Sequence, residues 1–541
     1  MTAMYLLALR LGRWGIAGFG AIAFLAPLLQ AAAFYQVAGH TPAERQAFGR
    51  SVTVLASQFS VIAAPPIRPD TVGGYVQFRG FGALAVLFAI WGLVSAVGAA
   101  RGDEERGIVD AALASGLSRP RLIAARVAAY ATGTVVAAFA ASAGLLVGAA
   151  GGGDSFSAFA AVEAGIVLAA LGISCFALTF LIAQFTSARS ATAVAGAVLL
   201  ALFLANSLSR TFEALVRWRS LSPFHYYELS SPLTPGGVVD LSATLILAGI
   251  AVMAAGLGML AFRYRDIGSP LIRLPATMRP ASYEASRVPF WMVPVVRDLY
   301  ERRAVLLLWT AGLSAVGAIF VVLTKAIVTP LLSIPALAHY LSAFVNGNVY
   351  PSFLGFIWLS FAQLLMAGFA VSHVARWSAE DLDGRLQAVL SNPVHRARVV
   401  FERAAALATG ALIIAMVSGT VVGLEAHYQS IELDRGRLVA ASLLLVPFTL
   451  VFGVVGALLA ARIPRAAVGL LGAFAFASYL AVQLGPIFKL PAWVQDASAF
   501  KLYGQPLTAG VDQTGLVIML GIVVAGLAAS AMVMRRREIG A

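Results

Sequence analysis

The sequence predicts an all-α membrane protein with about twelve transmembrane helices, arranged as two parallel six-helix halves. Three observations predict this class. Hydrophobic residues make up 60% of the 541-residue chain and charged residues only 12%, a balance that a water-soluble domain could not bury. Apolar runs long enough to cross a bilayer recur along the chain. A displacement of about 277 residues aligns one half of the sequence with the other.

The apolar runs have the length of membrane-spanning helices, because a bilayer core of about 30 Å requires roughly 20 helical residues. The sequence lacks the short alternating segments that form a membrane β-barrel. The first run is longer than the apolar part of a signal peptide, so we interpret it as a helix of the mature protein. The expected spans are 14–36, 79–100, 127–149, 158–184, 189–207, 242–262, 304–325, 352–375, 404–425, 438–461, 466–484 and 515–534.

Basic residues lie mostly on one side of the predicted membrane. Twelve crossings place both termini on one side, and the segments of that side carry 26 of the 38 Lys and Arg residues. The positive-inside rule therefore predicts that both termini are cytoplasmic. The Arg-rich and Ala-rich composition favours a bacterial cell membrane. The net charge of +13 reports topology, and it predicts no nucleic-acid partner because the arginines form no single patch.

The internal repeat sets the expected domain boundaries. The segment Glu104–Gly107 aligns with Asp381–Gly384, and Arg263–Gly268 aligns with Arg535–Gly540. Each half crosses the membrane six times, an even number, so the halves are parallel repeats related by an axis along the membrane normal. The long loop 37–78 has no counterpart of equal length, and no function is assigned to it. The expected parts are a first half at 1–268, a cytoplasmic linker and elbow at 269–303, and a second half at 304–541.

A short amphipathic helix is expected after the second span of each half, at 103–118 and 380–393. Each begins with acidic residues, which favour a helix N-terminus, and each carries an apolar residue at every fourth position. One interpretation is a helix lying among the lipid headgroups. The other is a docking helix for a cytoplasmic partner, which is favoured because the basic residues follow the helix and do not run along its polar face. The two apolar stripes are Val109, Leu113 and Leu117, and Leu382, Leu386 and Leu390.

These doubled motifs resemble the ABC-2 (type V) permease of ABC exporters, and the two fused halves resemble the membrane subunit of actinobacterial polyketide-antibiotic (tetronasin-type) exporters. The resemblance implies that the short helices are coupling helices, which dock one copy of this chain onto two copies of an ABC ATPase subunit. Leu382 stands where the first half has Glu105, so the two docking sites are expected to differ. The coupling residues that the resemblance implies are Glu104, Glu105, Gly107, Leu113, Arg119, Asp381, Gly384, Leu390 and Arg396.

The chain is not expected to be an enzyme. The phosphate-binding motif G-x-x-x-x-G-K-[ST] does not occur, and no lysine lies on the predicted cytoplasmic side. We therefore expect no cofactor in this chain, with ATP and Mg²⁺ bound by the partner ATPase subunits. The six scattered histidines and the lone Cys175 show no metal-ligand spacing. Neither a catalytic site nor a metal site is expected.

The alternative is a secondary transporter of the major-facilitator type, which also has two parallel six-helix halves. Coupling to an ion gradient normally requires ionisable side chains inside the membrane. The sequence places none near the middle of a span, since Glu163 and His373 lie close to span ends. The alternative also usually has a short loop after its second helix. These two differences favour an ATP-driven exporter.

Aromatic side chains mark the second span of each half. In the resembled family this span lines the central cavity, which implies a path for a hydrophobic compound such as a drug, a polyketide-like antibiotic or a lipid. Lipid-facing aromatics at the membrane boundary are the alternative. The candidate residues for this path are Phe81, Phe88, Trp91, Phe356, Trp358 and Phe361.

The segments 208–241 and 485–514, which precede the last span of each half, are expected to be extracellular. We expect them to form a gate during alternating access, with ordinary loop packing as the alternative. The repeat places the same residue types at equivalent positions in both segments. The candidate gate residues are Phe224, Tyr227, Phe500 and Tyr503.

Overall fold

The described part of the computed structural model is helical and contains no strand, which confirms the predicted all-α class. Eleven helices in this part have the length and apolar composition of a membrane span, and a twelfth, shorter apolar helix lies at Ala466–Val482. The chain is therefore a multi-pass membrane protein. The described residues are 2–58, 64–105, 107–152, 156–210, 212–271, 293–332, 349–391, 393–484, 491–496 and 498–536.

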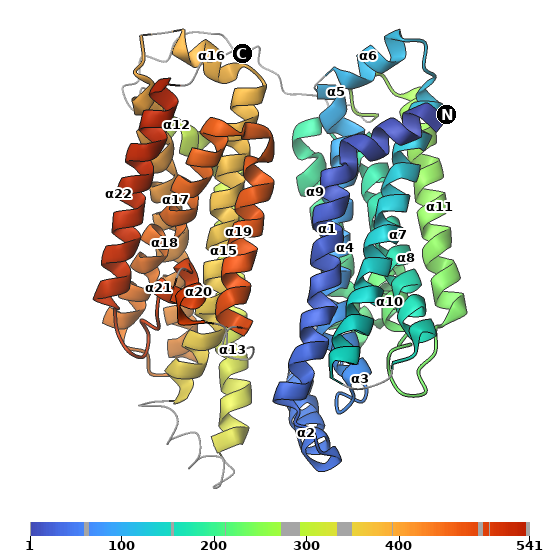
Figure 1. The fold of residues 1–541 in the computed structure, drawn as a ribbon, viewed down its shortest axis with the longest axis vertical. Helices are drawn as coiled ribbons and strands as arrows, with labels where there is room; N and C mark the ends of the chain where they lie inside the picture. Colours follow the sequence, from blue (N-terminus) through green and yellow to red (C-terminus); the bar gives the residue numbers. More distant parts are fainter. Residues whose placement is uncertain are drawn as a thin grey trace. The chain divides into compact units, whose positions relative to one another are not determined.

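Contacts between Cα atoms divide the chain into two units, Met1–Ala281 and Ser282–Ala541. Most of the expected linker 269–303 lies outside the described residues, which stop at 271 and resume at 293. Each unit has its own apolar core, built mainly from Ala, Leu, Val and Phe side chains of its long helices. Figure 1 shows the long helices of each unit running roughly side by side.

The first unit contains six long apolar segments with shorter helices between them (Figure 1). Its second span is assembled from five consecutive helical pieces, two of them π-helical. The helices are α1 (Thr2–Val37), α2 (Pro42–Gln58), α3 (Val72–Val76), η1 (Gln77–Phe81), α4 (Gly82–Val97), η2 (Gly98–Gly102), α5 (Asp103–Glu105), α6 (Ile108–Ala114), α7 (Arg119–Gly151), α8 (Ala158–Phe185), α9 (Ala188–Leu208), η3 (Glu213–Leu221), α10 (Pro223–Glu228) and α11 (Leu241–Tyr264).

The second unit repeats this order and adds a short helix before its first span. That helix, α12, is amphipathic and precedes the first span by a single residue. The helices are α12 (Pro294–Glu301), α13 (Arg303–Leu332), α15 (Val349–Leu382), α16 (Arg385–Leu390), α17 (Arg396–Tyr428), α18 (Arg435–Arg462), α19 (Pro464–Leu484), α20 (Ala492–Asp496), α21 (Ala499–Leu502) and α22 (Gln513–Arg536).

Small residues allow the spans to approach closely, as is common in membranes. A Cβ atom at Gly144 in α7 would lie 1.9 Å from the carbonyl oxygen of Phe24 in α1. A Cβ atom at Gly148 would lie 2.6 Å from the carbonyl oxygen of Leu28. The C-terminal halves of α1 and α7 are therefore held at backbone contact distance, and larger side chains at either glycine would push them apart.

The loop 37–78 contains structure that the sequence did not predict. Helix α2 begins with a capping box, because Thr41 Oγ1 accepts from the Glu44 N–H at 3.3 Å and Glu44 accepts from the Thr41 N–H at 3.0 Å.

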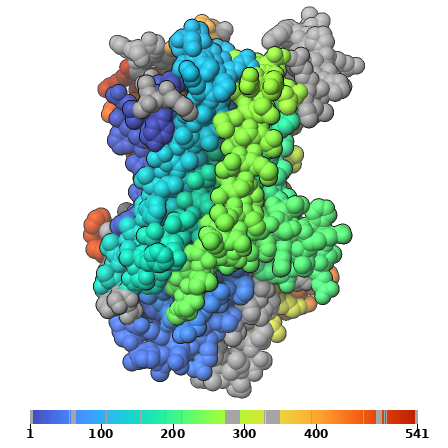
Figure 2. Space-filling model, turned by 90° about the vertical axis from the view of Figure 1, so that its right-hand side faces the viewer, coloured from blue at the N-terminus to red at the C-terminus, as the bar shows by residue number. Residues whose placement is uncertain are grey.

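On the same unit, Figure 2 shows α11 running along one face, with its end close to α6. Val109 of α6 and Phe262 of α11 belong to one apolar cluster, so the short helix packs on the last span of its unit.

Candidate functional site

The second span of each unit ends at a glycine in the left-handed conformation. Gly107 has φ 69° and Gly384 has φ 74°, and each is followed directly by the short helix α6 or α16. Glycine is favoured there because a Cβ atom strains this conformation. The expected helices 103–118 and 380–393 are thus corrected: the acidic residues belong to the end of the long span, and each short helix starts after its glycine.

Glu104 of the first unit is buried and lies between two buried arginines. Arg101 donates to its carboxylate at 3.2 Å, and Arg265, from the end of α11, donates to both carboxylate oxygens. The second guanidinium is held further by Gln184 Oε1, which accepts from Arg265 Nε at 2.8 Å. The ends of the second, fourth and sixth spans on one side of the first unit are therefore tied together by one charged network.

Backbone carbonyls complete this network around the arginines. Arg101 Nε donates to Ala183 O at 2.8 Å, and its Nη2 donates to Thr186 O at 2.6 Å. Both arginines also donate to Ser269 O at 3.2 Å. Buried charges need such partners because an unpaired one costs several kcal/mol. Glu104 is thus buried within its own unit, where it positions the start of the short helix.

In the second unit the corresponding region uses a different set of charges. Glu380 accepts from Arg376 at 2.8 Å and from Arg403 at 2.7 Å. Arg376 also reaches Asp298 at 3.4 Å and Glu301 at 2.9 Å, both in α12. Burial raises the pKa of the Asp298 carboxyl above its usual value, although Arg376 opposes this. The second span is therefore tied to the helix that precedes the first span.

Two contacts recur at equivalent positions in both units. Arg126 lies 2.8 Å from Asp103 in the first unit, as Arg403 lies 2.7 Å from Glu380 in the second. The predicted coupling residues Arg119 and Arg396 also act alike. Arg119 Nη1 donates to the carbonyls of Arg263 and Arg265, and Arg396 Nη1 donates to that of Arg535. Each anchors the start of the third span to the end of the sixth, where carbonyls attract a cation.

The apolar stripes face their own units along the short helices α6 and α16, while Leu382, at the end of α15, is exposed. Val109 and Leu386 are buried, while Leu113 and Leu390 are half-buried against the apolar clusters of their units. The insertion of Leu113 and Leu390 into a partner stays a prediction, and their side chains are partly covered by their own units. The exposed apolar side chains are Ile108, 42% exposed, and Val389, 45% exposed. The amphipathic pattern correctly predicted that each helix has an apolar face. It could not show whether that face packs against the same chain or against a partner.

The acidic positions beside the glycines differ in exposure. Glu105 is exposed, Asp381 is half-buried, and Leu382, which stands at the position of Glu105, is 51% exposed. The exposed end of the first short helix therefore carries a carboxylate where the second carries an apolar side chain. The difference between Glu105 and Leu382 therefore lies on the surface in both units.

The aromatic residues of the second spans are divided between core and surface. Phe81, Phe88 and Trp358 are fully buried in the cores of their units, so they line no open path in this structure. Phe356 and Phe361 are exposed on α15. The role of these residues in a substrate path stays a prediction.

The expected gate residues are buried and have structural partners. Tyr227 Oη donates to Phe81 O at 3.1 Å, and Tyr503 Oη donates to Ala441 O at 2.7 Å. Phe224 packs edge-on against Phe203 with ring centres 5.2 Å apart, and Phe500 packs against Tyr479 at 5.4 Å. In this structure these residues pin the segment before the last span to the neighbouring helices.

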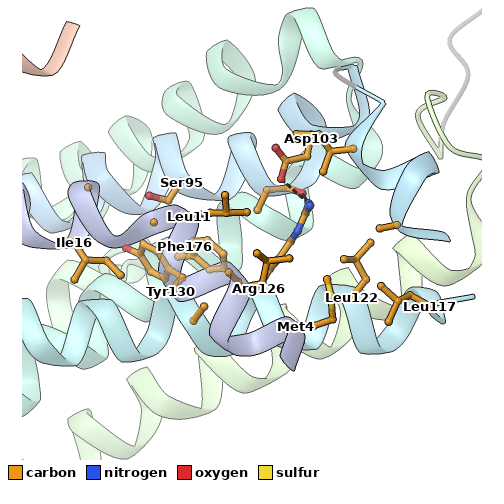
Figure 3. Close-up of a pocket in the computed structure, with 18 of the residues that line it drawn as sticks. Met4, Leu11, Ile16, Ser95, Asp103, Leu117, Leu122, Arg126, Tyr130 and Phe176 are labelled. Atoms are coloured by element: carbon orange, nitrogen blue, oxygen red, sulfur yellow. Dashed lines mark hydrogen bonds and ion pairs between the residues drawn. The ribbon is translucent and has the colours of Figure 1, made fainter. Parts of the chain in front are cut away.

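The first unit contains a pocket of about 640 Å³ beside α6. Figure 3 shows it between the N-terminal part of α1, the end of the second span and the start of α7, with the Asp103–Arg126 ion pair on its wall. Sequence reasoning missed this pocket, since its walls come from separate segments of the chain, from Met4 in α1 to Phe176 in α8. Its lining residues are Met4, Leu7, Ala8, Leu11, Gly12, Gly15, Ile16, Trp91, Ser95, Ala99, Asp103, Ile108, Ala112, Ser115, Leu117, Leu122, Arg126, Ala129, Tyr130 and Phe176.

The second unit has a smaller pocket of about 280 Å³ at the equivalent place. Seven of its lining positions align with lining positions of the first pocket in the internal repeat. The helix α12 forms the wall that α1 forms in the first unit. The aligned residues are Arg376, Glu380, Arg385, Val389, Val399, Arg403 and Ala406, which correspond to Ala99, Asp103, Ile108, Ala112, Leu122, Arg126 and Ala129.

Comparison with known protein families gives one assignment for the chain. The family profile described as multidrug efflux system permease Rv1217c, C-terminal domain, matches residues 5–263 and 299–535, which include the long helices of both units. A comparison with curated proteins gave no match. The matched segments cover most of the chain, so this protein belongs to the family of the multidrug efflux system permease Rv1217c C-terminal domain and is a membrane permease of the efflux type.

Proposed function

We propose that the chain is the membrane-spanning permease subunit of an ATP-driven ABC exporter of the ABC-2 type. It would move hydrophobic compounds, such as drugs, polyketide-like antibiotics or lipids, out of a bacterial cell. One copy would bind two copies of a separate ABC ATPase subunit. The parts of the transporter would be the first half at 1–268, the linker at 269–303 and the second half at 304–541, with both termini in the cytoplasm.

The observation that carries this proposal is the doubled short helix. Each unit has one, placed between a left-handed glycine and an arginine, Arg119 or Arg396, that anchors the start of the third span to the end of the last span. A helix fixed in this way moves with the spans, because the buried charges around its base resist separation. It is therefore suited to carry a partner's motion into the membrane.

The surfaces available to a partner are the exposed sides of these helices. On α6 they carry Ile108 and Asp110, with Glu105 before it at the end of the second span. On α16 they carry Arg385 and Val389, with Leu382 and Asp383 before it. The first surface is acidic and the second is not. A partner with two identical subunits would therefore make unequal contacts at the two helices.

Transport assays in inside-out vesicles test the energy source. Vesicles that contain the chain and its ATPase subunit should accumulate an uncharged hydrophobic dye when ATP is supplied. We expect accumulation to persist after ionophores collapse the proton and sodium gradients, and to stop when a non-hydrolysable ATP analogue replaces ATP. Accumulation that follows an imposed ion gradient without ATP would refute the proposal and favour the secondary transporter.

A further inference from the structure

The pocket beside α6 has the size and the lining of a binding site for a hydrophobic molecule. Its volume of about 640 Å³ lies within the range of about 300–1,000 Å³ that is usual for drug-sized ligands. Leu7, Leu11, Leu117 and Phe176 are among the side chains that line it. Leu7 and Leu11 are also exposed to the surroundings, so the pocket opens beside the first turns of α1.

The charges of this pocket favour an uncharged occupant. Asp103 and Arg126 are its two charged lining residues, and they lie 2.8 Å apart as an ion pair. Arg126 also donates to Ala99 O at 3.0 Å. A ligand with a net charge would lose its hydration and would meet a wall that is already neutral. An apolar group would lose little on entry and would release water from apolar walls.

The backbone of α1 leaves room for such a group. Gly12 and Gly15 line the pocket, and a Cβ atom at Gly15 would meet no other atom within 4 Å. The equivalent pocket of the second unit offers no such room, since Arg376 and Arg385 replace Ala99 and Ile108 and the volume falls to about 280 Å³. The apolar pocket is therefore a property of the first unit and not of the repeat.

The pocket also touches the short helix. Ile108, Ala112 and Ser115 of α6 form part of its wall. An occupant would thus contact the same helix that the proposed function assigns to ATPase docking. Occupancy would change the packing beneath α6, and through it the fit of that helix to a partner.

We infer that this pocket of the first unit binds an uncharged, largely apolar group, and that the bound group changes the packing of α6. The group is either the acyl chain of a membrane lipid or a hydrophobic compound awaiting export. The binding step rests on the pocket alone, whereas an effect of binding on ATPase docking rests on the proposed function.

Photolabelling of the purified full chain in lipid nanodiscs tests the binding step. The probes are an uncharged aromatic diazirine and a phosphatidylcholine with a diazirine in one acyl chain. We expect one of them to label Ala112 or Leu117, because these residues lie on the pocket wall. The aromatic probe would identify a transported compound as the source, and the phospholipid probe would identify a lipid.

A matched pair of glycine variants separates pocket binding from general lipid contact. In Gly15→Phe the ring enters the pocket, while in Gly18→Phe it does not, since Gly18 is not part of the lining and also has no atom near its Cβ. We expect Gly15→Phe to reduce labelling of the wall by about tenfold, because filling the volume leaves no room for a ligand. Gly18→Phe should label like the unmodified chain.

Two results would overturn the inference: no labelling of the wall by either probe, or equal labelling in both glycine variants. Exposed Leu308 on α13 serves as the lipid-contact reference, and its labelling should stay unchanged in both variants. The assay needs neither ATP nor a partner. If ATP-driven transport fails, the photolabelling result still decides whether the pocket binds a ligand. If photolabelling fails, the proposed function is not affected.

Discussion

The two pockets beside the short helices occupy equivalent places in the repeat, yet their chemistry differs. In the first unit the pocket is apolar, has a volume of about 640 Å³ and holds one ion pair. In the second unit the volume is about 280 Å³. Arginines and carboxylates from α12, α15, α16 and α17 line the smaller pocket. Equivalent backbone positions therefore line an apolar pocket in the first unit and carry a network of ion pairs in the second.

The charged contacts at the bases of the two short helices also differ between the units. Glu104 reaches the ends of α8 and α11 through Arg265 and its contact with Gln184, whereas Glu380 reaches α12 through Arg376. The first short helix is thus fixed to spans of its own bundle. The second is fixed to the helix that leads into its bundle. The repeat therefore preserves the left-handed glycine and the ion pair Asp103–Arg126 or Glu380–Arg403, whereas the other charged contacts differ between the units.

The largest effect is expected from the buried carboxylate of the first unit. Glu104→Gln should lower the free energy of unfolding by about 3–5 kcal/mol, because it leaves the two buried arginines without their counter-charge. Thermal unfolding of the purified chain in detergent measures the loss. The neighbouring Glu105→Gln is the control, and it should change stability by no more than about 0.5 kcal/mol because its side chain is exposed. Equal losses in the two variants would show that Glu104 does not brace the unit.

The next effect concerns the pocket. Ile108→Arg places in the first unit the residue that the second unit has at Arg385. The side chain lies on an exposed helix, so folding should be unaffected, while photolabelling of the pocket wall should fall by roughly tenfold, or about 1.4 kcal/mol. The reverse change, Arg385→Ile, serves as the control and should leave labelling of the first pocket unchanged. Unaltered labelling in Ile108→Arg would contradict the charge argument.

The expected gate tyrosines offer a comparison in which the units should agree. Tyr227→Phe and Tyr503→Phe each remove one buried hydroxyl that donates to a carbonyl. Each should cost about 1 kcal/mol of stability. If the tyrosines only pack, transport per folded molecule should stay constant in both variants. A fall in transport without a matching fall in thermal stability would instead support a gate.

The smallest effect is expected at Asp298, where burial raises the pKa of the carboxyl. A raised pKa means that folding favours the protonated form, so the ionised carboxylate destabilises the fold at neutral pH, and this penalty disappears as the pH falls through the raised pKa. Asp298→Asn should therefore be as stable as the unmodified chain or slightly more stable at pH 7 to 8. The difference should close on acidification. A clear loss of stability at pH 7 would show that the ion pair with Arg376 outweighs burial.

Hydropathy predicted most of the fold, because each span must be apolar along its length. The repeat also aligned Gly107 with Gly384, and the structure shows that both have a left-handed backbone. The contacts of Glu104 could not be predicted, since Arg265 lies 161 positions away in the sequence. The direction of the apolar stripe at Leu113 was also hidden, because periodicity shows that a helix has an apolar face and not what covers it.

The placement of the aromatic residues was equally hidden from the sequence. Trp358 and Phe356 are two positions apart on α15, yet one is buried and the other is 63% exposed. Helical spacing puts them on different faces, and only the packing of neighbouring spans decides which face is covered. Of the predicted aromatic residues, Trp91 lies in the wall of the pocket of the first unit.

The central claim is that both short helices dock onto separate ATPase subunits, and cysteine crosslinking tests it most directly. Asp110 and Gln387 are equivalent, exposed positions on α6 and α16, and the native Cys175 is fully buried. In membranes that show ATP-driven export, Asp110→Cys and Gln387→Cys should each crosslink to one ATPase subunit, and the double variant should crosslink to two. Export that continues with no crosslink at either position, or with only one subunit attached in the double variant, would contradict the account.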